Sequence, residues 1–361
     1  MSKETSVKLI NTITLFNSIK SEWKAFEKSI NHSNLTSSYD WLNAWWYTFK
    51  DVENNIIGYN KELVIICLYE NNCLISVAPF IKVCRKKYGV KIRFLEFLGQ
   101  QWAGNYIDIL TEKPQFNQEI FDWLYKNQKF DVLMLKYIPQ YSKNFNLENL
   151  HLYSACPEIE ISEYLSHDDY VKNKYSKNLK QNIRTAFNKA RKKGININTC
   201  VQEISTCNFN EMIRISKFKL VERKSWMYGD NNKLIFMKEV LKKMSSNVVF
   251  VQLDGKNVAY RSNVFFNNNK YCIDASYDRN YREFELGSIS VDANLKDSYF
   301  KGVSKHCLGP GLDLYKKKFT KRNIRIYIFL KKGNTLLAQI IIKPIKILTL
   351  IKEKEAKQLL Q

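Results

Sequence analysis

Apolar and polar positions follow one another in the same order in both halves of the chain. The first half predicts a Trp-bearing apolar segment and then three strands, at residues 41–49, 63–69, 73–83 and 91–98. The second half predicts a helix and then three strands, at residues 212–226, 248–253, 257–266 and 270–277. Polar turns separate the strand runs. The repeated order predicts a duplicated α/β unit, although two unrelated strand meanders would give the same pattern.

After the third strand the pattern changes to a helix and then to a further strand. In the second half, positions 287–300 have a mainly helical rhythm, Gly302 ends it, and a strand runs through His306 and Leu308. Antiparallel hairpins followed by a strand–helix–strand crossover give a mixed sheet. We therefore predict an α/β fold divided into domains at 1–165 and 166–325 and a basic amphipathic tail at 326–361.

Composition and charge narrow the class of partner. With 361 residues, 45% of them hydrophobic, the chain can build two cores. The net charge is +22; residues 1–165 carry 18 Lys and Arg against 18 Asp and Glu, whereas residues 166–361 carry 39 against 17. This excess predicts a polyanionic partner for the second half, such as a nucleotide-type cofactor, a phosphorylated glycan, RNA or an anionic membrane. A Lys-rich and Asn-rich composition without function is the alternative.

The numbers and spacing of cysteine and histidine, and the length of the apolar runs, argue against a disulfide-bonded, metal-binding or membrane-spanning protein. The eight cysteines form no C-x-x-C pair and lie mostly in strand-like runs, which is typical of reduced core thiols. With only four histidines in addition, we expect no metal site. No apolar run reaches the length of a spanning helix, and the first ten residues lack the features of a secretory signal. We expect a cytoplasmic protein, with peripheral contact at the inner face of the membrane left open.

A Gly-Pro-Gly turn at 309–311, followed by Tyr315 and Lys316, carries the candidate chemistry. Gly309 and Gly311 allow the chain to turn sharply and to lie close to a ligand. Tyr315 and Lys316 supply a phenol and a cation, which stabilise the oxyanion that develops when an acyl group is attacked. A surface turn followed by a solvated basic run is the alternative.

The order of these pieces resembles the acetyltransferase domain of the CelD/BcsL-like branch of the GNAT acyl-CoA transferases. In the second half the similarity rests on the helix 176–194, the hairpin 248–266, the segment 275–281, Gly287 and the turn 309–316. In the first half, 94–99 followed by 106–110 resembles that family's strand, glycine turn and strand. The resemblance covers residues 41–319 and implies a tandem duplicated GNAT-like acyltransferase fold whose N-terminal copy is degenerate.

The arrangement is also similar to the Fem-type transferases, in which a tandem GNAT-like pair adds amino acids from aminoacyl-tRNA to peptidoglycan precursors. An aromatic–Lys pair near their C-terminus matches Tyr315 and Lys316. Two donors therefore stay open: acetyl-CoA or another acyl-CoA, which we favour, and aminoacyl-tRNA. The lack of a recognisable coiled-coil arm disfavours the tRNA donor.

The resemblance implies a cofactor site. In GNAT proteins the pantetheine lies between two splayed strands, and backbone amides at the start of the next helix bind the pyrophosphate. Gly287 and Ser288 occupy that place, Arg282 precedes it, and the cofactor-binding set is completed by Gly309 and Gly311. The usual phosphate loop has two or more glycines, whereas this chain has one. The alternative is that Gly287 and Ser288 only begin a helix.

Acyl transfer also needs groups that accept and donate protons. We place Asp278 in the catalytic set with Tyr315 and Lys316, and prefer it to Asp274 because it stands at a strand end. A turn residue that bonds its own backbone is the alternative for Asp278. His306, alone in an apolar strand, is interpreted as a core residue.

The predicted helix 172–193 combines one apolar stripe with basic faces. The resemblance implies that it borders the acceptor cleft, and our acceptor-binding candidates are Lys180, Arg184, Arg223 and Tyr281. A solvated basic face is the alternative. The expected acceptor is an amine or hydroxyl of a sugar, polysaccharide or cell-envelope precursor.

The residues after Phe319 carry ten Lys and Arg against two Glu. We expect this tail to dock on the second domain, with contact to an anionic membrane as the alternative. Taken together, the sequence predicts an acyl-CoA-dependent acyltransferase, with acetyl as the expected group. A non-catalytic protein that binds RNA or anionic glycan is the alternative from another class.

Overall fold

The computed structural model describes residues 5–30, 33–87, 89–103, 105–220, 227–311, 313 and 315–360. The chain divides into two compact units, one formed by residues 1–155 and 324–361 and the other by residues 156–323. Each unit has its own core. The α/β fold with mixed sheets is therefore confirmed.

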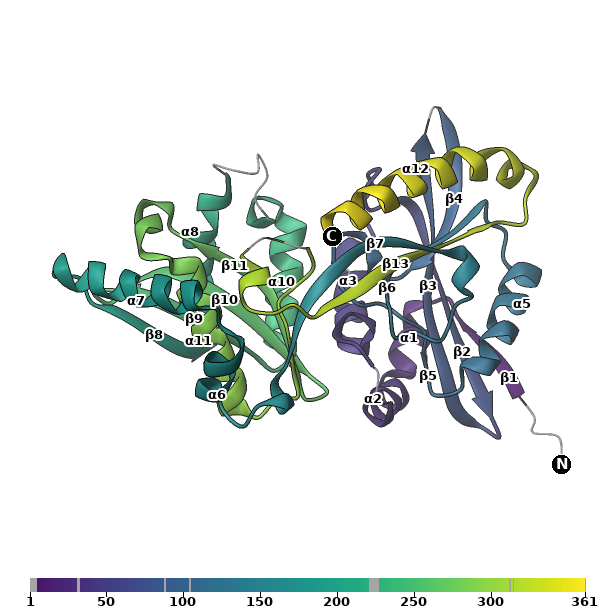
Figure 1. The fold of residues 1–361 in the computed structure, drawn as a ribbon. Coiled ribbons are helices and arrows are strands. Elements are labelled where there is room, and N and C mark those ends of the chain that lie inside the picture. The colour runs from purple at the N-terminus through teal and green to yellow at the C-terminus, as the bar shows by residue number, and fades with distance from the viewer. Residues whose placement is uncertain are drawn as a thin grey trace. The chain divides into compact units, whose positions relative to one another are not determined.

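The first unit builds its sheet in the order β1-β2-β3-β4-β6-β13 (Figure 1). Its strands are β1 (Thr5–Ile10), β2 (Tyr59–Glu70), β3 (Cys73–Lys87), β4 (Val90–Phe97), β5 (Leu110–Thr111), β6 (Val132–Pro139) and β13 (Asn323–Lys332). Its helices are α1 (Ile13–Ser18), α2 (Lys20–Ser29), α3 (Tyr39–Phe49), α4 (Gln100–Ala103), α5 (Asn117–Asn127) and α12 (Leu336–Leu360). Strands β2, β3 and β4 pair antiparallel, and β6 then pairs parallel to β4. Side chains from β2, β3, β4, β6 and α5 form the core.

The second unit repeats this order. Its strands are β8 (Ile197–Glu203), β9 (Ser246–Leu253), β10 (Lys256–Phe266), β11 (Asn269–Tyr277) and β12 (Lys305–Cys307), and β7 (Leu150–Glu160) enters it from the first unit. Its helices are α6 (His167–Lys174), α7 (Lys177–Lys192), α8 (Thr206–Ser216), α10 (Asn231–Lys243) and α11 (Leu286–Lys301). Strands β9, β10 and β11 pair antiparallel, and β12 pairs parallel to β11. The predicted duplication is confirmed in the topology of the two sheets.

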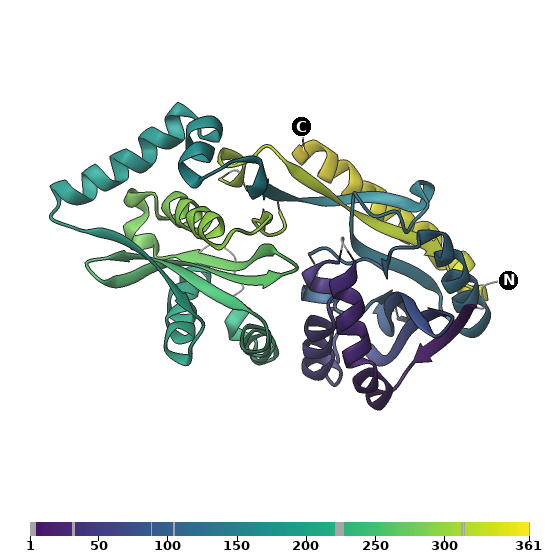
Figure 2. The same ribbon diagram turned by 90° about the horizontal axis from the view of Figure 1, so that it is seen from below.

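Helices cover both faces of this second sheet. Figure 2 shows α11 on one face and α8 and α10 on the other. Helix α11 packs with α7 on Val251, Val258 and Ala259 of the sheet. Because side chains alternate along a strand, successive residues of β10 and β11 face different helices. Arg261 therefore points towards α11, and Asp274 points towards the segment that follows α8.

Two predicted helices end differently from the sequence expectation. The predicted helix 172–193 is two helices, α6 and α7, because Ser176 accepts a hydrogen bond from the Leu179 N–H (3.1 Å) and begins a new helix. The predicted helix 212–226 is α8, which ends at Ser216, followed by one 3-10 turn at Lys217–Lys219. Its last residues, including Arg223, lie outside the described residues.

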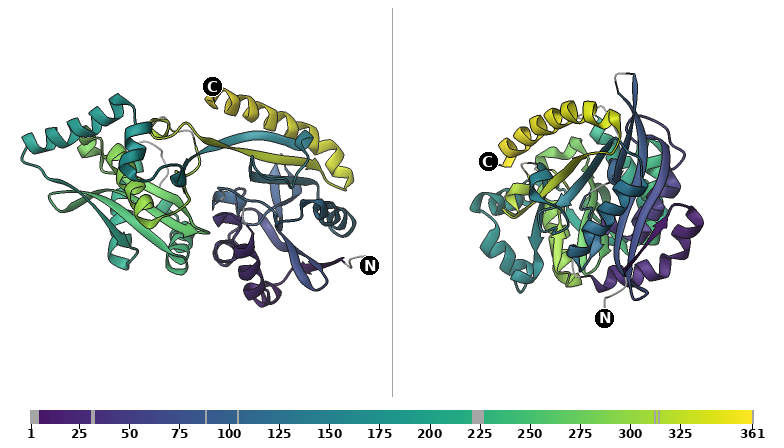
Figure 3. Two further views of the ribbon diagram at one scale, coloured as in Figure 1. Left: turned by 60° about the horizontal axis from the view of Figure 1, so that its bottom comes forward. Right: turned by 90° about the vertical axis from the view of Figure 1, so that its right-hand side faces the viewer.

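The expected docking of the C-terminal tail on the second domain is wrong. Strand β13 pairs antiparallel with β6, so the tail completes the sheet of the first unit. Helix α12 follows and runs beside β13, as the left view of Figure 3 shows. Glu353 of α12 is paired with His151 (3.0 Å), which anchors the helix to the first unit. None of the described helices is both long enough and apolar enough to cross a membrane.

Candidate functional site

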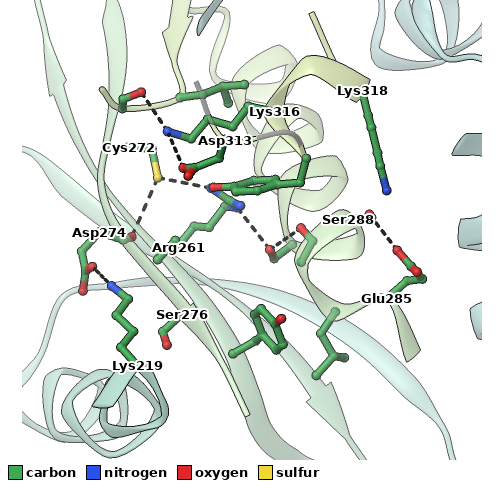
Figure 4. A pocket seen from close by; sticks show the side chains of 18 of the residues that line it. Lys219, Arg261, Cys272, Asp274, Ser276, Glu285, Ser288, Asp313, Lys316 and Lys318 are labelled. Carbon is green, nitrogen blue, oxygen red and sulfur yellow. Dashed lines mark hydrogen bonds and ion pairs between the residues drawn. The ribbon is translucent and has the colours of Figure 1, made fainter. Parts of the chain in front are cut away.

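A pocket lies in the second unit where β11 and β12 separate. The described parts of the two strands pair from Asn269 to Tyr271 of β11, and no described strand pairs with the rest of β11 on that side. The pocket has a volume of about 710 Å³. It is lined by residues 272–277 of β11, the start of α11 and the Gly-Pro-Gly segment after β12 (Figure 4). The opening of the sheet, rather than a groove on its face, therefore creates the site.

The Gly-Pro-Gly turn is held in place by Lys316. The Lys316 ammonium donates to the carbonyl oxygens of Gly309 (3.0 Å), Pro310 (3.1 Å) and Gly311 (3.3 Å). The lysine side chain is buried, and Asp313 lies 3.4 Å from its Nζ. Gly309 has a φ of +82°, and a Cβ there would lie 3.0 Å from the Cys272 carbonyl oxygen. Lys316 and Gly309 thus shape the wall of the pocket, and the ammonium is already bonded to three carbonyls.

Arg261 is a buried cation in the pocket wall that the sequence analysis missed. Its Nε donates to Ser290 Oγ (3.1 Å), its Nη1 contacts Cys272 Sγ (3.6 Å), and its guanidinium lies 5.5 Å from the centre of the Tyr315 ring (Figure 4). Burial by itself lowers the pKa of Arg261. The neighbouring Tyr315 and Cys272 raise the pKa by more than this, so the net pKa is raised and the guanidinium stays charged. A charge inside the apolar run of β10 was the signal that marked this residue in the sequence.

Asp274 belongs to a hydrogen-bonded group on the opposite face of β11. Lys219 pairs with its Oδ1, and its Oδ2 accepts from Tyr228 (3.0 Å) and Tyr260. Burial raises the pKa of both tyrosines well above the ordinary value, so both remain hydrogen-bond donors. With three donors on its two oxygens, this carboxylate is already well satisfied.

The start of α11 differs from a phosphate-binding loop. Glu285 adopts a left-handed conformation (φ +50°) at the N-cap, and its carbonyl accepts from the N–H groups of Ser288 and Ile289. Its carboxylate accepts from Ser288 Oγ (3.2 Å). A Cβ added at Gly287 would meet nothing within 4 Å, so the pocket is open there. The protein itself therefore places a negative charge where the resemblance implied a pyrophosphate.

Several of the predicted site residues come together in the pocket: Arg282, Gly287, Ser288, Gly309, Tyr315 and Lys316. Gly311 is one residue beyond the lining Pro310 and contributes its carbonyl to Lys316. Asp278 is not a lining residue; its buried carboxylate accepts from the Asn280 N–H (3.0 Å) and caps the turn 279–284. This capping role corrects the reason for preferring Asp278 to Asp274, since Asp278 faces neither solvent nor pocket.

The predicted acceptor-binding residues lie elsewhere. Lys180 and Arg184 are exposed on α7, where they donate to the Lys172 carbonyl (3.0 Å) and to Gln181 (2.5 Å). Tyr281 packs against the core beneath α7 and α11. Arg223 falls outside the described residues. The structure therefore does not bring Lys180, Arg184 or Tyr281 into the pocket. Among the described residues, no group of His, Cys, Asp and Glu side chains gathers as a metal site would need.

In the first unit the equivalent opening is filled. Strands β4 and β6 pair in parallel only through Phe94 and Leu95, and the buried side chain of Gln100 follows. Its Oε1 accepts from the N–H groups of Phe97 (3.1 Å) and Lys136 (3.0 Å), and its Nε2 donates to the Met134 carbonyl (3.1 Å). One amide side chain thus joins the two strands where the second unit has a pocket.

Solved structures with the same fold support this description. FemX matches with a TM-score of 0.62 and 10% identity over 90% of this chain and 98% of its own. The C-terminal domain of a putative lysylphosphatidylglycerol synthetase from Agrobacterium fabrum matches with a TM-score of 0.51 and 9% identity, covering 91% and 96% of the two chains. A tandem GNAT protein from the clavulanic acid biosynthesis pathway matches with a TM-score of 0.50 and 9% identity, over 90% of this chain and 98% of its own.

These identities are low, so the likenesses define the fold: both units together form a tandem GNAT-like fold. No family model matches the chain, and no curated protein matches it significantly. The CelD/BcsL-like resemblance therefore stays a prediction.

Proposed function

We propose that this protein is an acyltransferase whose reaction takes place in the pocket of the second unit. The observation that carries the proposal is the pocket between separated parallel strands, with Tyr315, Arg261 and the start of α11 in its wall. Two structures with a similar fold carry names that support this proposal: one is a putative lysylphosphatidylglycerol synthetase, and the other is a tandem GNAT protein. The first unit, whose opening Gln100 fills, serves a non-catalytic role in this proposal.

The proposed chemistry joins the acyl carbon to an amine or hydroxyl of the acceptor. The acceptor loses one proton, and the leaving thiolate or ribose oxygen of the donor gains one. Tyr315, a phenol beside the Arg261 cation, is our candidate donor of that proton. Asp313, a pocket carboxylate 3.4 Å from Lys316, is our candidate acceptor in place of Asp278. Lys316 contributes by holding the Gly-Pro-Gly turn in place. The cations that line the pocket, Arg261 and Lys316, stabilise the oxyanion.

Acetyl-CoA remains the donor that we propose first. The strand opening suits a pantetheine, and Gly287, Ser288 and Arg282 lie along the pocket beside it. One observation favours aminoacyl-tRNA as the second candidate: the Glu285 carboxylate stands at the start of α11, where it would repel a CoA pyrophosphate. The proposed acceptor is an amine or hydroxyl of a sugar, polysaccharide or cell-envelope precursor in either case.

Calorimetric titration with acetyl-CoA tests the proposal. We expect saturable binding to the wild type and its loss in Gly287→Trp, because a side chain at this position enters open pocket space without a Cβ clash. Thermal unfolding of the variant controls for the fold. If the folded wild type does not bind acetyl-CoA, transfer of labelled aminoacyl groups from aminoacyl-tRNA to amine acceptors is measured next. Failure of both donors would overturn the acyltransferase proposal.

A further inference from the structure

The pocket of the second unit contains a buried positive charge that has only neutral partners. Arg261 is 3% exposed and contacts Ser290, Cys272 and Tyr315. Among the described residues, no Asp or Glu forms an ion pair with it, whereas the buried Lys270 of the same sheet is paired with Asp297. A buried charge without a counter-ion is costly, and native proteins normally pair it. The missing counter-ion of Arg261 therefore needs an explanation.

The surroundings of Arg261 point to a ligand. Further cations line the same pocket, among them Arg282 and Lys318, both exposed at its edge. The carboxylates in the lining have other partners: Glu285 accepts from Ser288, Asp313 lies beside Lys316 and Asp274 pairs with Lys219. Asp274, a buried carboxylate on β11, points away from α11 and is bonded to Lys219, Tyr228 and Tyr260. A guanidinium has five N–H donors in a planar fork, which matches a carboxylate or a phosphate group. Ser290 and Cys272 accept from two of them, which leaves donors for a ligand.

We propose that Arg261 is the binding site for an anionic group, a carboxylate or a phosphate, on a substrate of the pocket. The inference rests on the proposed function only in that the bound anion belongs to a substrate. Anion binding at Arg261 does not itself require acyl transfer. It adds to that function the requirement that one substrate carries a negative charge close to the Gly-Pro-Gly turn. The bound anion would supply the counter-ion that the protein lacks.

The test uses thermal unfolding with inorganic phosphate, pyrophosphate or acetate, each at an ionic strength held constant with sodium chloride. We expect the anion that fits to raise the Tm of the wild type and to leave Arg261→Met unchanged. A larger effect of phosphate or pyrophosphate identifies a phosphate subsite, and a larger effect of acetate identifies a carboxylate subsite. Arg191→Met is the matched control, because Arg191 is exposed on α7 and its loss removes the same charge outside the pocket.

The stability of the free variant separates a binding role from a structural one. If Arg261 serves a ligand, Arg261→Met removes an uncompensated buried charge, and its Tm without added anion stays equal or rises by about 2–4 °C. A clear drop in Tm would assign Arg261 to the framework and overturn the proposal. An equal anion effect in wild type and Arg261→Met would also overturn it. Neither result depends on whether acetyl-CoA binds, so this inference and the proposed function fail separately.

A second inference comes from α12 in the first unit. One face of this helix packs on the unit through Ala338, Ile341, Ile345, Thr349 and Ala356. The face turned the other way is also apolar, with Ile340 exposed by 73%, Ile347 by 59% and Ile351 by 52%. Residues at such spacing lie on one side of a helix. A folded helix that is apolar on its outer side as well has an unpartnered interaction surface.

Lysines border this outer face. At 100° per residue, Lys343 and Lys354 lie within about 60° of the exposed isoleucines, and Lys346 follows on the same side at about 120°. Glu355 lies about 60° from the isoleucines on the opposite side. Among the described residues, no carboxylate lies within ion-pair distance of these three, whereas Lys357 is paired with Glu353 (2.7 Å). An apolar strip flanked by cations is the pattern of a helix that lies in the plane of an anionic bilayer surface.

We infer that the outer face of α12 binds an anionic lipid surface. Flotation with phosphatidylcholine vesicles, with and without phosphatidylglycerol, measures it. We expect the wild type to bind only the anionic vesicles. The triple variant Ile340→Ser, Ile347→Ser, Ile351→Ser should bind them with an affinity that is reduced at least about tenfold. Neutralising the bordering lysines, with Lys343→Gln, Lys346→Gln and Lys354→Gln, should remove the preference for anionic lipid.

A control variant replaces three exposed apolar residues outside α12: Ile56→Ser, Leu165→Ser and Phe300→Ser. It should bind vesicles as the wild type does. The inference is overturned if the wild type does not float with anionic vesicles or if both triple serine variants lose binding equally. It is also overturned if sedimentation shows a dimer that only the α12 variant dissociates, since the face would then bind a second copy of the chain.

Discussion

At the residue scale, the buried ammonium of Lys316 explains the shape of the pocket wall. Three consecutive carbonyls of the Gly-Pro-Gly turn point at one Nζ, so the turn converges on a single charge. The sequence predicted that Lys316 stabilises an oxyanion. Its contacts suggest that positioning the turn comes first, because the ammonium has three donors and each has a carbonyl acceptor within reach.

Replacing Lys316 with Met should therefore cost stability as well as binding. Lys316→Met leaves buried carbonyls without a donor, and we expect the free energy of unfolding to fall by about 1–3 kcal/mol in urea denaturation. The matched change Lys318→Met, at an exposed position two residues later, should stay within about 0.5 kcal/mol of the wild type. Equal stability of the two variants would show that the turn does not depend on the ammonium.

Asp108 makes the first unit sensitive to pH. Burial raises the pKa of Asp108 to about 7, although Asn144, Ser142 and the Ile109 N–H all bond its carboxylate. In the unfolded chain an Asp has a pKa of about 3.9. The folded protein therefore holds this proton more tightly, and the associated stability is present at low pH and is lost as the pH rises from about 4 to 7.

The variant Asp108→Asn should remove this dependence. Between pH 5 and pH 8, we expect the wild type to lose more unfolding free energy than Asp108→Asn, by about 2–4 kcal/mol. Urea unfolding at both pH values measures the difference. The control Asp51→Asn, at an exposed carboxylate of the same unit, should follow the wild type. A parallel pH dependence of all three proteins would contradict a raised pKa at Asp108.

At the element scale, the two units differ at the place where their parallel strands separate. In the first unit Gln100 fills the opening between β4 and β6 with three hydrogen bonds to backbone groups. In the second unit none of the described side chains bridges the corresponding opening in this way, and the opening forms the pocket. The same supersecondary element therefore gives a closed sheet in one copy and a candidate site in the other.

Gln100→Ala should destabilise the first unit, because it leaves the Phe97 and Lys136 N–H groups and the Met134 carbonyl without their partner. We expect a loss of about 2–4 kcal/mol in the free energy of unfolding. Gln101→Ala is the neighbouring control, since the Gln101 side chain donates to the Glu96 carboxylate and its loss should cost about 1 kcal/mol or less. Circular dichroism in urea measures both, and similar small losses would argue against a structural role for Gln100.

At the scale of the whole molecule, the chain returns to the first unit after completing the second. Strand β13 pairs with β6. Phe329 of β13 packs in the first core, where its ring centre lies 5.9 Å from that of Phe121 and 5.1 Å from that of Phe145. The first unit therefore needs residues that are about 200 positions away from its other strands in sequence. We therefore expect its folding to need nearly the entire chain.

Chains of different length test this dependence. A chain ending at residue 322 lacks β13, and we expect hydrogen exchange to show loss of protection in β4 and β6. A chain ending at residue 335 keeps β13 and removes only α12, so these two strands should stay protected. Equal protection in both truncated chains would show that β13 is dispensable for the first core.

The local pattern made most of the fold predictable. Strands β2, β3, β4, β9, β10 and β11 lie where alternating apolar runs between polar turns indicated. The prediction of one helix at 172–193 missed a break at Ser176. The apolar stripe continues across this residue, but its side chain caps a new helix. Of the site, the pocket residues Tyr315, Lys316, Gly287 and Ser288 were found, since a turn and a helix start mark them locally. Arg261 was missed because a strand residue acquires its surroundings only from neighbouring strands and helices.

The sequence by itself determined the elements, their duplicated order and the excess of positive charge in the second half, because periodicity and composition are local properties of the chain. Only the tertiary structure decided that Asp278 caps a turn, that Lys316 holds three carbonyls and that β13 belongs to the first sheet. Each of these depends on which distant segments pair, and pairing is chosen by the burial of whole faces in one core rather than by any short motif. The separation of β11 from β12, which makes the pocket, belongs to the same class of properties.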